Sequence, residues 1–213
     1  MRILTKLWMV MIILLFMGCD DLPLQKNFDY DGEAIDPYVY MTAMEWLESK
    51  GEQFSEMIEA IKYAEMTSYY TQMDVKYTFL VIQNTALKAW ANNNGGLTIS
   101  DVDKIKVQNL LKYHIVKGQY SAYNKETPVE PVFVKNLLSG EDGLMTIRCV
   151  KSSYPIYGET VTSGNIMINT TRSNGVSPQR GSVTSNIFPT NGVIHVFSDY
   201  AYYKRDNNYK VLF

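Results

Sequence analysis

The chain has 213 residues, of which 20 are basic and 22 are acidic, and its formal net charge at pH 7 is −2. A chain of this length can form one domain with a substantial core. No cluster of lysine or arginine stands out along it. Nucleic-acid-binding proteins carry such basic patches, so we expect no nucleic-acid partner.

Residues 1–18 have the composition of a targeting signal. Two positive side chains precede an apolar run over residues 7–17, about half the roughly 20 residues that a membrane-spanning helix needs. The run stops at Gly18 and Cys19 and then turns acidic. This arrangement resembles a bacterial lipoprotein signal, which implies cleavage before Cys19, lipidation of Cys19 by acyl chains such as palmitate, and attachment to a membrane through that lipid. An ordinary signal peptide or a short anchor is the alternative.

The residues after Cys19 bear on where the protein is displayed. Asp20 and Asp21 resemble the surface-export signal of Bacteroidetes lipoproteins, which implies a lipid-anchored protein on the outer membrane, facing outward. In enteric bacteria an aspartate at this place would imply retention at the inner membrane. Residues 19–36 hold no persistent apolar period, so we expect a flexible tether that leads to a single domain at residues 37–213.

The first half of that domain has the periodicity of helices around one short strand. Apolar residues follow the i, i+3, i+4, i+7 rule from Phe54 to Ile61, and Tyr77–Ile82 predicts a buried strand. Asn84 is expected to N-cap the next helix. Ser100 is expected to N-cap a further helix, with Asp103 at the acidic position of a capping box.

The second half has the character of strands. Runs that are apolar or alternating lie at Val132–Leu137, Leu144–Val150, Asn165–Asn169 and Val193–Phe197, separated by glycine, asparagine and serine. Helices followed by strands indicate an α+β fold. The stretch Ser152–Val183 is rich in small polar residues, and we expect it to form long loops or hairpin tips.

Cysteine usage is sparse. Once Cys19 is lipidated, Cys149 is the remaining thiol, so no intramolecular disulfide can form. Cys149 alternates with Ile147 on one face of a predicted strand, as a small buried side chain does.

The two histidines of the chain lie in apolar settings. Tyr113 and His114 end a helical run, and His195 lies in the strand-like Asn191–Val196. The segment Tyr77–Leu87 precedes both. Together these three segments resemble the fasciclin-like domain, whose hallmarks are a Tyr-His pair on a helix and a late Asn-Gly-Val-Ile-His strand.

The resemblance implies N-terminal helices packed on a β-sandwich or wedge formed mainly by the C-terminal half, and a role in adhesion or binding. It also implies that the motif residues form part of the structural core: Tyr113, His114, Asn191, Gly192, Val193, Ile194 and His195. Their apolar neighbours favour histidines bonded to the backbone over metal ligands or direct contacts with a partner. Since a third metal ligand, a nucleophile elbow and a phosphate-binding loop are all missing, we expect no metal site, cofactor or enzymatic activity.

Tyrosine is abundant, with 16 residues, and its flat ring with a polar tip suits recognition surfaces. Tyr154 and Tyr157, in the expected loops, are the candidate ligand-binding residues. The leading interpretation is a lipid-anchored cell-surface module that binds a protein or a matrix-type ligand. The alternative is an accessory glycan-binding lipoprotein of an outer-membrane nutrient-uptake system.

Overall fold

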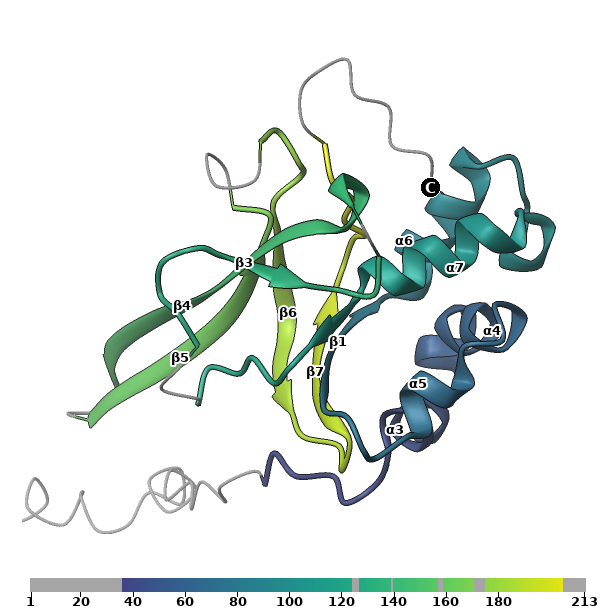
Figure 1. Ribbon diagram of the computed structural model, residues 1–213. Helices are drawn as coiled ribbons and strands as arrows, with labels where there is room; N and C mark the ends of the chain where they lie inside the picture. The colour runs from purple at the N-terminus through teal and green to yellow at the C-terminus, as the bar shows by residue number, and fades with distance from the viewer. Residues whose placement is uncertain (1–35, 124–126, 139, 157–158, 171–174, 205–213) are drawn as a thin grey trace, which may run out of the picture. The chain divides into compact units, whose positions relative to one another are not determined.

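The computed structural model describes residues 36–204, apart from 124–126, 139, 157–158 and 171–174, and gives only the backbone of residues 152–156 and 159–163 (Figure 1). The chain divides into two units between Asp36 and Pro37, and the second unit holds the helices and strands of the described residues. The predicted signal, Cys19 and the tether lie outside the described residues. None of the helices in the described part is both long and apolar enough to span a bilayer.

The first half of the domain is helical. Its α-helices are α3 (Ala43–Ser49), α4 (Ser55–Tyr63), α5 (Thr67–Thr71), α6 (Asn84–Asn93) and α7 (Lys104–Tyr113), and short 3-10 turns lie at Gly51–Phe54, Ile99–Asp101 and Glu141–Gly143. Figure 1 shows the α-helices gathered on one side of the sheet, next to its first strand. Each α-helix buries at least one apolar or aromatic side chain, as amphipathic helices do when they cover a sheet.

The strands form one mixed sheet. They are β1 (Tyr77–Ile82), β2 (Ile115–Lys117), β3 (Val132–Lys135), β4 (Leu144–Ile156), β5 (Glu159–Ile168), β6 (Arg180–Ile187) and β7 (Gly192–Phe197). Their order is β2-β1-β7-β6-β5-β4-β3, and β1 and β7 are parallel while the other neighbours are antiparallel. The predicted α+β class is therefore confirmed.

The two outer strands of this order meet. Val116 of β2 forms an antiparallel bridge with Asn136, one residue beyond β3. The amide of Leu137 also donates to the carbonyl of Ile115, with 3.2 Å between nitrogen and oxygen. The sheet therefore curls until its edges touch, which leaves fewer unpaired edge groups than an open sheet would.

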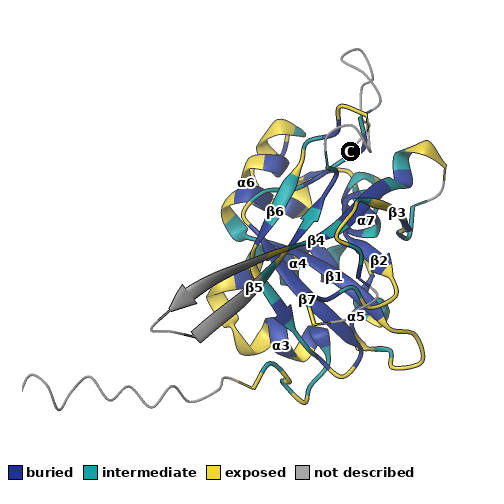
Figure 2. Cartoon of the chain, turned by 90° about the vertical axis from the view of Figure 1, so that its left-hand side faces the viewer, coloured by how far each residue is buried: buried dark blue, intermediate teal, exposed yellow. Residues whose placement is uncertain are grey.

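The centre of the fold is the parallel pair β1 and β7. All six residues of each strand are buried, and Figure 2 shows both strands in the buried colour. Strands that are covered on both faces carry continuous apolar runs rather than alternating ones. This explains why Tyr77–Ile82 and the Val-Ile-His-Val run are apolar throughout.

Both predicted helix caps are wrong. Gln83 occupies the N-cap of α6, and Asn84 is its first helical residue. The side-chain amide of Asn84 instead bonds the backbone near the start of α4. Its oxygen accepts from the backbone N–H of Glu56 at 3.1 Å, and its nitrogen donates to the backbone carbonyl of Glu52 at 2.7 Å. Asn84 therefore caps α4 from a neighbouring helix.

The capping box predicted for Ser100 and Asp103 lies two residues earlier in the chain. It joins Thr98 to Asp101, and Val102 then takes an extended conformation that ends the turn. Asp103 is itself the N-cap of α7, because its carboxylate accepts from the amides of Ile105 and Lys106. The single helix expected from Ser100 is thus a 3-10 turn followed by an α-helix.

The expectation that Ser152–Val183 forms long loops or hairpin tips is confirmed only for the β4–β5 hairpin, because much of the stretch is strand. β4 continues to Ile156 and pairs with β5 over ten registered positions, and β6 occupies residues 180–187. Figure 1 shows β4 and β5 running out beyond the rest of the sheet. These strands could not be recognised from the sequence because their side chains are mostly small and polar. Backbone hydrogen bonds hold the ladder there, so no alternation of apolar residues marks it.

Candidate functional site

His114 closes the end of α7. It is the C-cap of the helix, and its ring is 1% exposed. The Nδ1–H donates to the carbonyl of Leu110 at 2.8 Å, and Nε2 accepts from the amide of Ala201 at 3.1 Å. The imidazole therefore ties the segment that follows β7 to the end of a helix from the first half.

His195 has the same kind of environment in β7. It is fully buried, its Nε2–H donates to the carbonyl of Tyr120 at 2.7 Å, and its Nδ1 accepts from the amide of Asn186 at 3.2 Å. The ring thus joins β7 to β6 and to the segment that follows β2. The neighbouring residue on that segment, Gln119, is exposed.

Burial keeps both histidines neutral. Removal from water lowers the pKa of His114 to about 4, against the opposing effects of the Leu110 carbonyl and the charge of Asp199. Burial likewise lowers the pKa of His195 to about 4, against the effect of the Tyr120 carbonyl. Since all four ring nitrogens are engaged by the backbone, neither ring has a lone pair for a metal. Within the described ranges, no group of three His, Cys, Asp or Glu could hold a metal ion.

Asn191 and Gly192 join the helices to the start of β7. The buried side chain of Asn191 accepts from the amide of Ala43 at 2.9 Å and donates to the carbonyl of Tyr70 at 2.8 Å. A Cβ on Gly192 would collide with the carbonyl oxygen of Tyr77 on β1. A side chain at this position would force the two strands apart.

Tyr113 completes the set of motif residues in the core. Its ring is fully buried, and its hydroxyl lies 2.9 Å from the Leu144 carbonyl and 3.2 Å from Oδ1 of Asn169. Val193 and Ile194 are also fully buried. Every motif residue is thus buried in the described structure.

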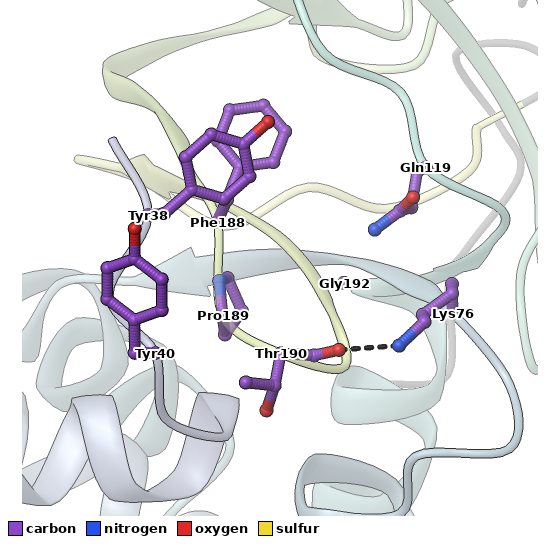
Figure 3. Close-up of a pocket in the computed structure, with 8 residues that line it drawn as sticks. All are labelled: Tyr38, Tyr40, Lys76, Gln119, Phe188, Pro189, Thr190 and Gly192. Carbon is purple, nitrogen blue, oxygen red and sulfur yellow. Dashed lines mark hydrogen bonds between the residues drawn. The ribbon is translucent and has the colours of Figure 1, made fainter. Parts of the chain in front are cut away.

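A surface pocket of about 320 Å³ lies next to this core (Figure 3). Its lining comes from three parts of the chain: the entry segment of the domain, the turn between β6 and β7 with the first residue of β7, and the residues just before β1 and just after β2. The lining residues are Tyr38, Tyr40, Lys76, Gln119, Phe188, Pro189, Thr190 and Gly192. This volume is at the lower end of the range of about 300–1,000 Å³ found for small-molecule sites.

One wall of the pocket is aromatic. The rings of Tyr38 and Phe188 are tilted against each other with centroids 5.1 Å apart, and Tyr123 stacks on Phe188 at 6.0 Å. Tyr38 is 57% exposed and Tyr40 is 79% exposed. Such exposed rings on a folded backbone are typical of recognition surfaces.

The backbone of the entry segment fixes this wall. Tyr38 forms a parallel bridge with Phe188, and the amide of Phe188 donates to the carbonyl of Pro37 at 2.8 Å. The amide of Thr190 donates to the carbonyl of Met41, also at 2.8 Å. The segment therefore lies along the turn before β7 like a short extra strand.

The opposite wall is polar. Figure 3 shows Lys76 and Gln119 across the pocket from Tyr38, Tyr40 and Pro189. The ammonium of Lys76 donates to the carbonyl of Thr190 at 2.5 Å. Among the residues that line the pocket, Lys76 carries the formal charge, and no carboxylate is present.

This pocket is not where the sequence predicted a ligand site. Tyr154 lies in β4 rather than in a loop, and Tyr157 lies outside the described residues. The residues that line the pocket come from other parts of the described chain. The available sequence signal was the alternation of Tyr38 and Tyr40 directly after the expected tether. Their partner Phe188 is about 150 residues away and could not be assigned to them without the fold.

Cys149 is fully buried in β4, and burial raises the pKa of its thiol. A reactive cysteine needs solvent access and nearby positive charge, so this thiol serves as a small core side chain. It has no part in the pocket.

The chain belongs to the fasciclin domain family, which it matches over residues 52–200. The fold is similar to that of a FAS1 domain pair from the insect cell adhesion molecule fasciclin I, with a TM-score of 0.50 and 13% sequence identity. The match covers 76% of this chain and 50% of that structure, so the chain spans about half the length of the pair. A comparison with curated proteins found no match. Fasciclin domains are generally involved in cell adhesion or binding.

Proposed function

We propose that the protein is a lipid-anchored recognition module, displayed on the outer surface of the cell, that binds a protein or a matrix-type ligand. The observation that carries this proposal is the contrast between the pocket and the motif. The aromatic rings of the pocket face solvent, whereas the imidazoles and the thiol are buried and engaged in the core. A molecule built in this way can bind a ligand on its aromatic rings, while its two imidazoles and the Cys149 thiol are withdrawn from solvent.

The anchor is supported by the sequence before the domain. The apolar run that ends at Gly18 and Cys19 is too short to span a bilayer, and the acidic pair follows directly. The pocket is lined by residues near the start of the domain, including Tyr38 and Tyr40.

A glycan-binding accessory lipoprotein of an outer-membrane uptake system is the second candidate. The aromatic wall favours it, because flat rings paired with hydrogen-bonding side chains suit sugars as well as peptides. Neighbouring genes separate the two candidates: an outer-membrane transporter beside this gene favours uptake, and its absence favours adhesion.

The anchor is tested with Cys19→Ser in the full chain. We expect the substitution to abolish labelling by a fatty-acid analogue and to release the protein from membranes, because the thioether to the lipid can no longer form. Cys149→Ser is the matched control and should keep the label. Undiminished labelling of Cys19→Ser would contradict the proposal.

Display and adhesion are tested on intact cells. An external protease should remove the protein without lysis if it faces outward. Cells that carry it should adhere to immobilised matrix proteins or glycans more than cells that lack it. Protection from the protease until lysis, with no difference in adhesion, would overturn the proposal.

A further inference from the structure

We infer that the pocket between the entry segment and the turn before β7 binds the pyranose ring of a glycan, with the ring face on the aromatic wall and the hydroxyls on the polar wall. This inference rests on the proposed recognition function, takes the glycan of the second candidate as the ligand, and assigns it a site. It moves the binding surface from Tyr154 and Tyr157 to Tyr38, Tyr40, Lys76 and Gln119.

The aromatic wall matches one side of a sugar ring. A pyranose presents a face of C–H groups that is apolar and slightly positive, and an aromatic ring presents a negative π-face. Tyr38, with Phe188 beside it, and the more exposed Tyr40 lie on the same side of the pocket in Figure 3. The wall can therefore receive the flat face of a ring without losing hydrogen bonds.

The polar wall matches the edge of the same ring. An ammonium has three N–H donors, and Lys76 directs one of them to the carbonyl of Thr190. Gln119 carries an amide that can donate and accept, and Thr190 adds a hydroxyl. Sugar hydroxyls both donate and accept hydrogen bonds, so a wall with mixed donors and acceptors suits them better than it suits a purely apolar ligand.

The polar wall is held in place by the buried motif. His195 donates to the carbonyl of Tyr120, and the Tyr120 amide donates to the hydroxyl of Thr78 at 2.9 Å. Gln119 precedes this fixed residue. On the other side, the missing side chain of Gly192 lets β1 and β7 approach closely, which brings Lys76 within reach of Thr190. A rigid second layer of this kind lowers the entropic cost of binding.

The backbone conformation of Tyr40 supports a binding role for its ring. Its φ is 51°, in the left-handed region that residues other than glycine, asparagine and aspartate rarely adopt. The side chain is nevertheless a large exposed tyrosine, where asparagine would fit the backbone better. Strained residues of this kind gather at binding sites.

The alternatives fit the lining less well. With no carboxylate and one lysine, the pocket has no ligand set for a divalent cation and too little positive charge for a phosphate cluster. An extended peptide would seek an unpaired strand edge, but the entry segment already pairs with residues 188–190. A pocket of about 320 Å³ suits one or two sugar rings.

The experiment uses the full chain, extracted with a detergent that has no sugar headgroup. Saturation-transfer NMR and calorimetry would measure binding of cellobiose, chitobiose, maltose, lactose and mannobiose, and galactose would be compared with galacturonate. We expect at least one neutral sugar to bind, with the strongest saturation transfer at the C–H protons of one ring face. Binding of galacturonate alone would show that Lys76 recognises a charge, and would overturn stacking as the main contact.

Three substitutions then locate the site. Tyr40→Asn and Tyr38→Ala should each weaken binding about ten-fold or more, and Lys76→Met should weaken it less. Tyr40→Asn should keep or raise the melting temperature, because asparagine tolerates a positive φ. Phe133→Ala, an equally exposed aromatic residue on β3, is the matched control and should bind normally.

The outcomes separate this inference from the proposed function. Absence of sugar binding by the wild-type chain, or equal binding by all variants, overturns the sugar pocket. If such a protein is still displayed on the cell and still adheres to matrix proteins, the proposed function stands. Loss of display and adhesion, with sugar binding intact, overturns the proposed function alone.

Discussion

Gly192 sets the distance between the two central strands. A Cβ there would collide with the carbonyl oxygen of Tyr77, which is backbone and cannot move aside alone. We expect Gly192→Ala to reduce the free energy of unfolding by at least about 2 kcal/mol, as overpacking in a core does. Chemical denaturation of the purified variant measures it.

Gly181 on β6 is the matched control for this prediction. A Cβ there would meet the sulfur of Met167, whose flexible side chain can turn away. Gly181→Ala should therefore be tolerated much better than Gly192→Ala. Equal costs for the two substitutions would contradict the steric explanation.

The two buried histidines make the stability depend on pH. In the folded state each has a pKa of about 4, lowered by burial from 6.5. The unfolded chain therefore takes up two more protons than the folded one between these values, and stability falls as the pH falls below 6.5. The full loss is on the order of 3 kcal/mol per histidine once the pH reaches about 4.

Denaturation at a series of pH values between about 5 and 6 tests this dependence, because most carboxylates stay ionised there. His195→Gln should halve the slope of unfolding free energy against pH, although its absolute stability will be lower. A wild-type slope near zero in this window would show that the rings are already charged in the folded protein.

At the scale of single residues, the sequence allowed the burial of the histidines to be predicted, because apolar neighbours surround both of them. Their hydrogen-bond partners could not be predicted. Ala201 and Tyr120 are far from the two rings along the chain and meet them only in the folded sheet. The same limit hid the aromatic pocket, since Tyr38 and Phe188 become neighbours through backbone pairing.

At the scale of elements, Asn191 fastens two helices to the sheet. Its side chain pairs the first amide of α3 and a carbonyl of α5, and both contacts are buried. Asn191→Ala would leave two backbone groups unpaired, at about 1–3 kcal/mol each. We expect a combined loss of roughly 2–5 kcal/mol, measured by thermal or chemical denaturation.

Asn84→Ala is the control for Asn191→Ala. The side chain of Asn84 also bonds a backbone amide, that of Glu56 in α4, and a backbone carbonyl, that of Glu52 in the preceding 3-10 turn, but its contact with Glu52 is exposed. Water can replace the lost partner there, so the cost should stay below about 1.5 kcal/mol. A larger effect at Asn84 than at Asn191 would contradict the role of burial.

The existence and order of most elements could be predicted from the sequence, but their boundaries could not. Apolar periodicity identified α4 and β1, whereas β6 and the outer half of the β4–β5 hairpin were missed because serine and threonine dominate them. The cap of α7 was misplaced because Ser100, Asp101 and Asp103 all suit capping. The extended conformation of Val102 decides between a single helix and a 3-10 turn followed by α7.

At the scale of the whole molecule, Cys149 reports on global unfolding. It is fully buried, and burial raises the pKa of its thiol. With Cys19 acylated, we expect the native protein to resist a thiol reagent at neutral pH and to react stoichiometrically in denaturant. Among variants of the protein, the rate at which the reagent labels Cys149 in native buffer should fall as the free energy of unfolding rises. Rapid labelling without denaturant would show that β4 opens locally.

The parallel pairing of β1 with β7 has a consequence for how the chain reaches its fold. The two strands are separated by more than about 100 residues along the chain, yet they pair side by side at the centre of the sheet. The entropy of closing so long a loop is lost before the strands gain packing contacts, and proteins with many such long-range contacts fold slowly. The sheet cannot be completed until Phe197, which pairs with Ile82 of β1, has been synthesised. The α-helices are therefore synthesised before the strand that completes the centre of the sheet, so the core forms only once nearly the whole domain is available.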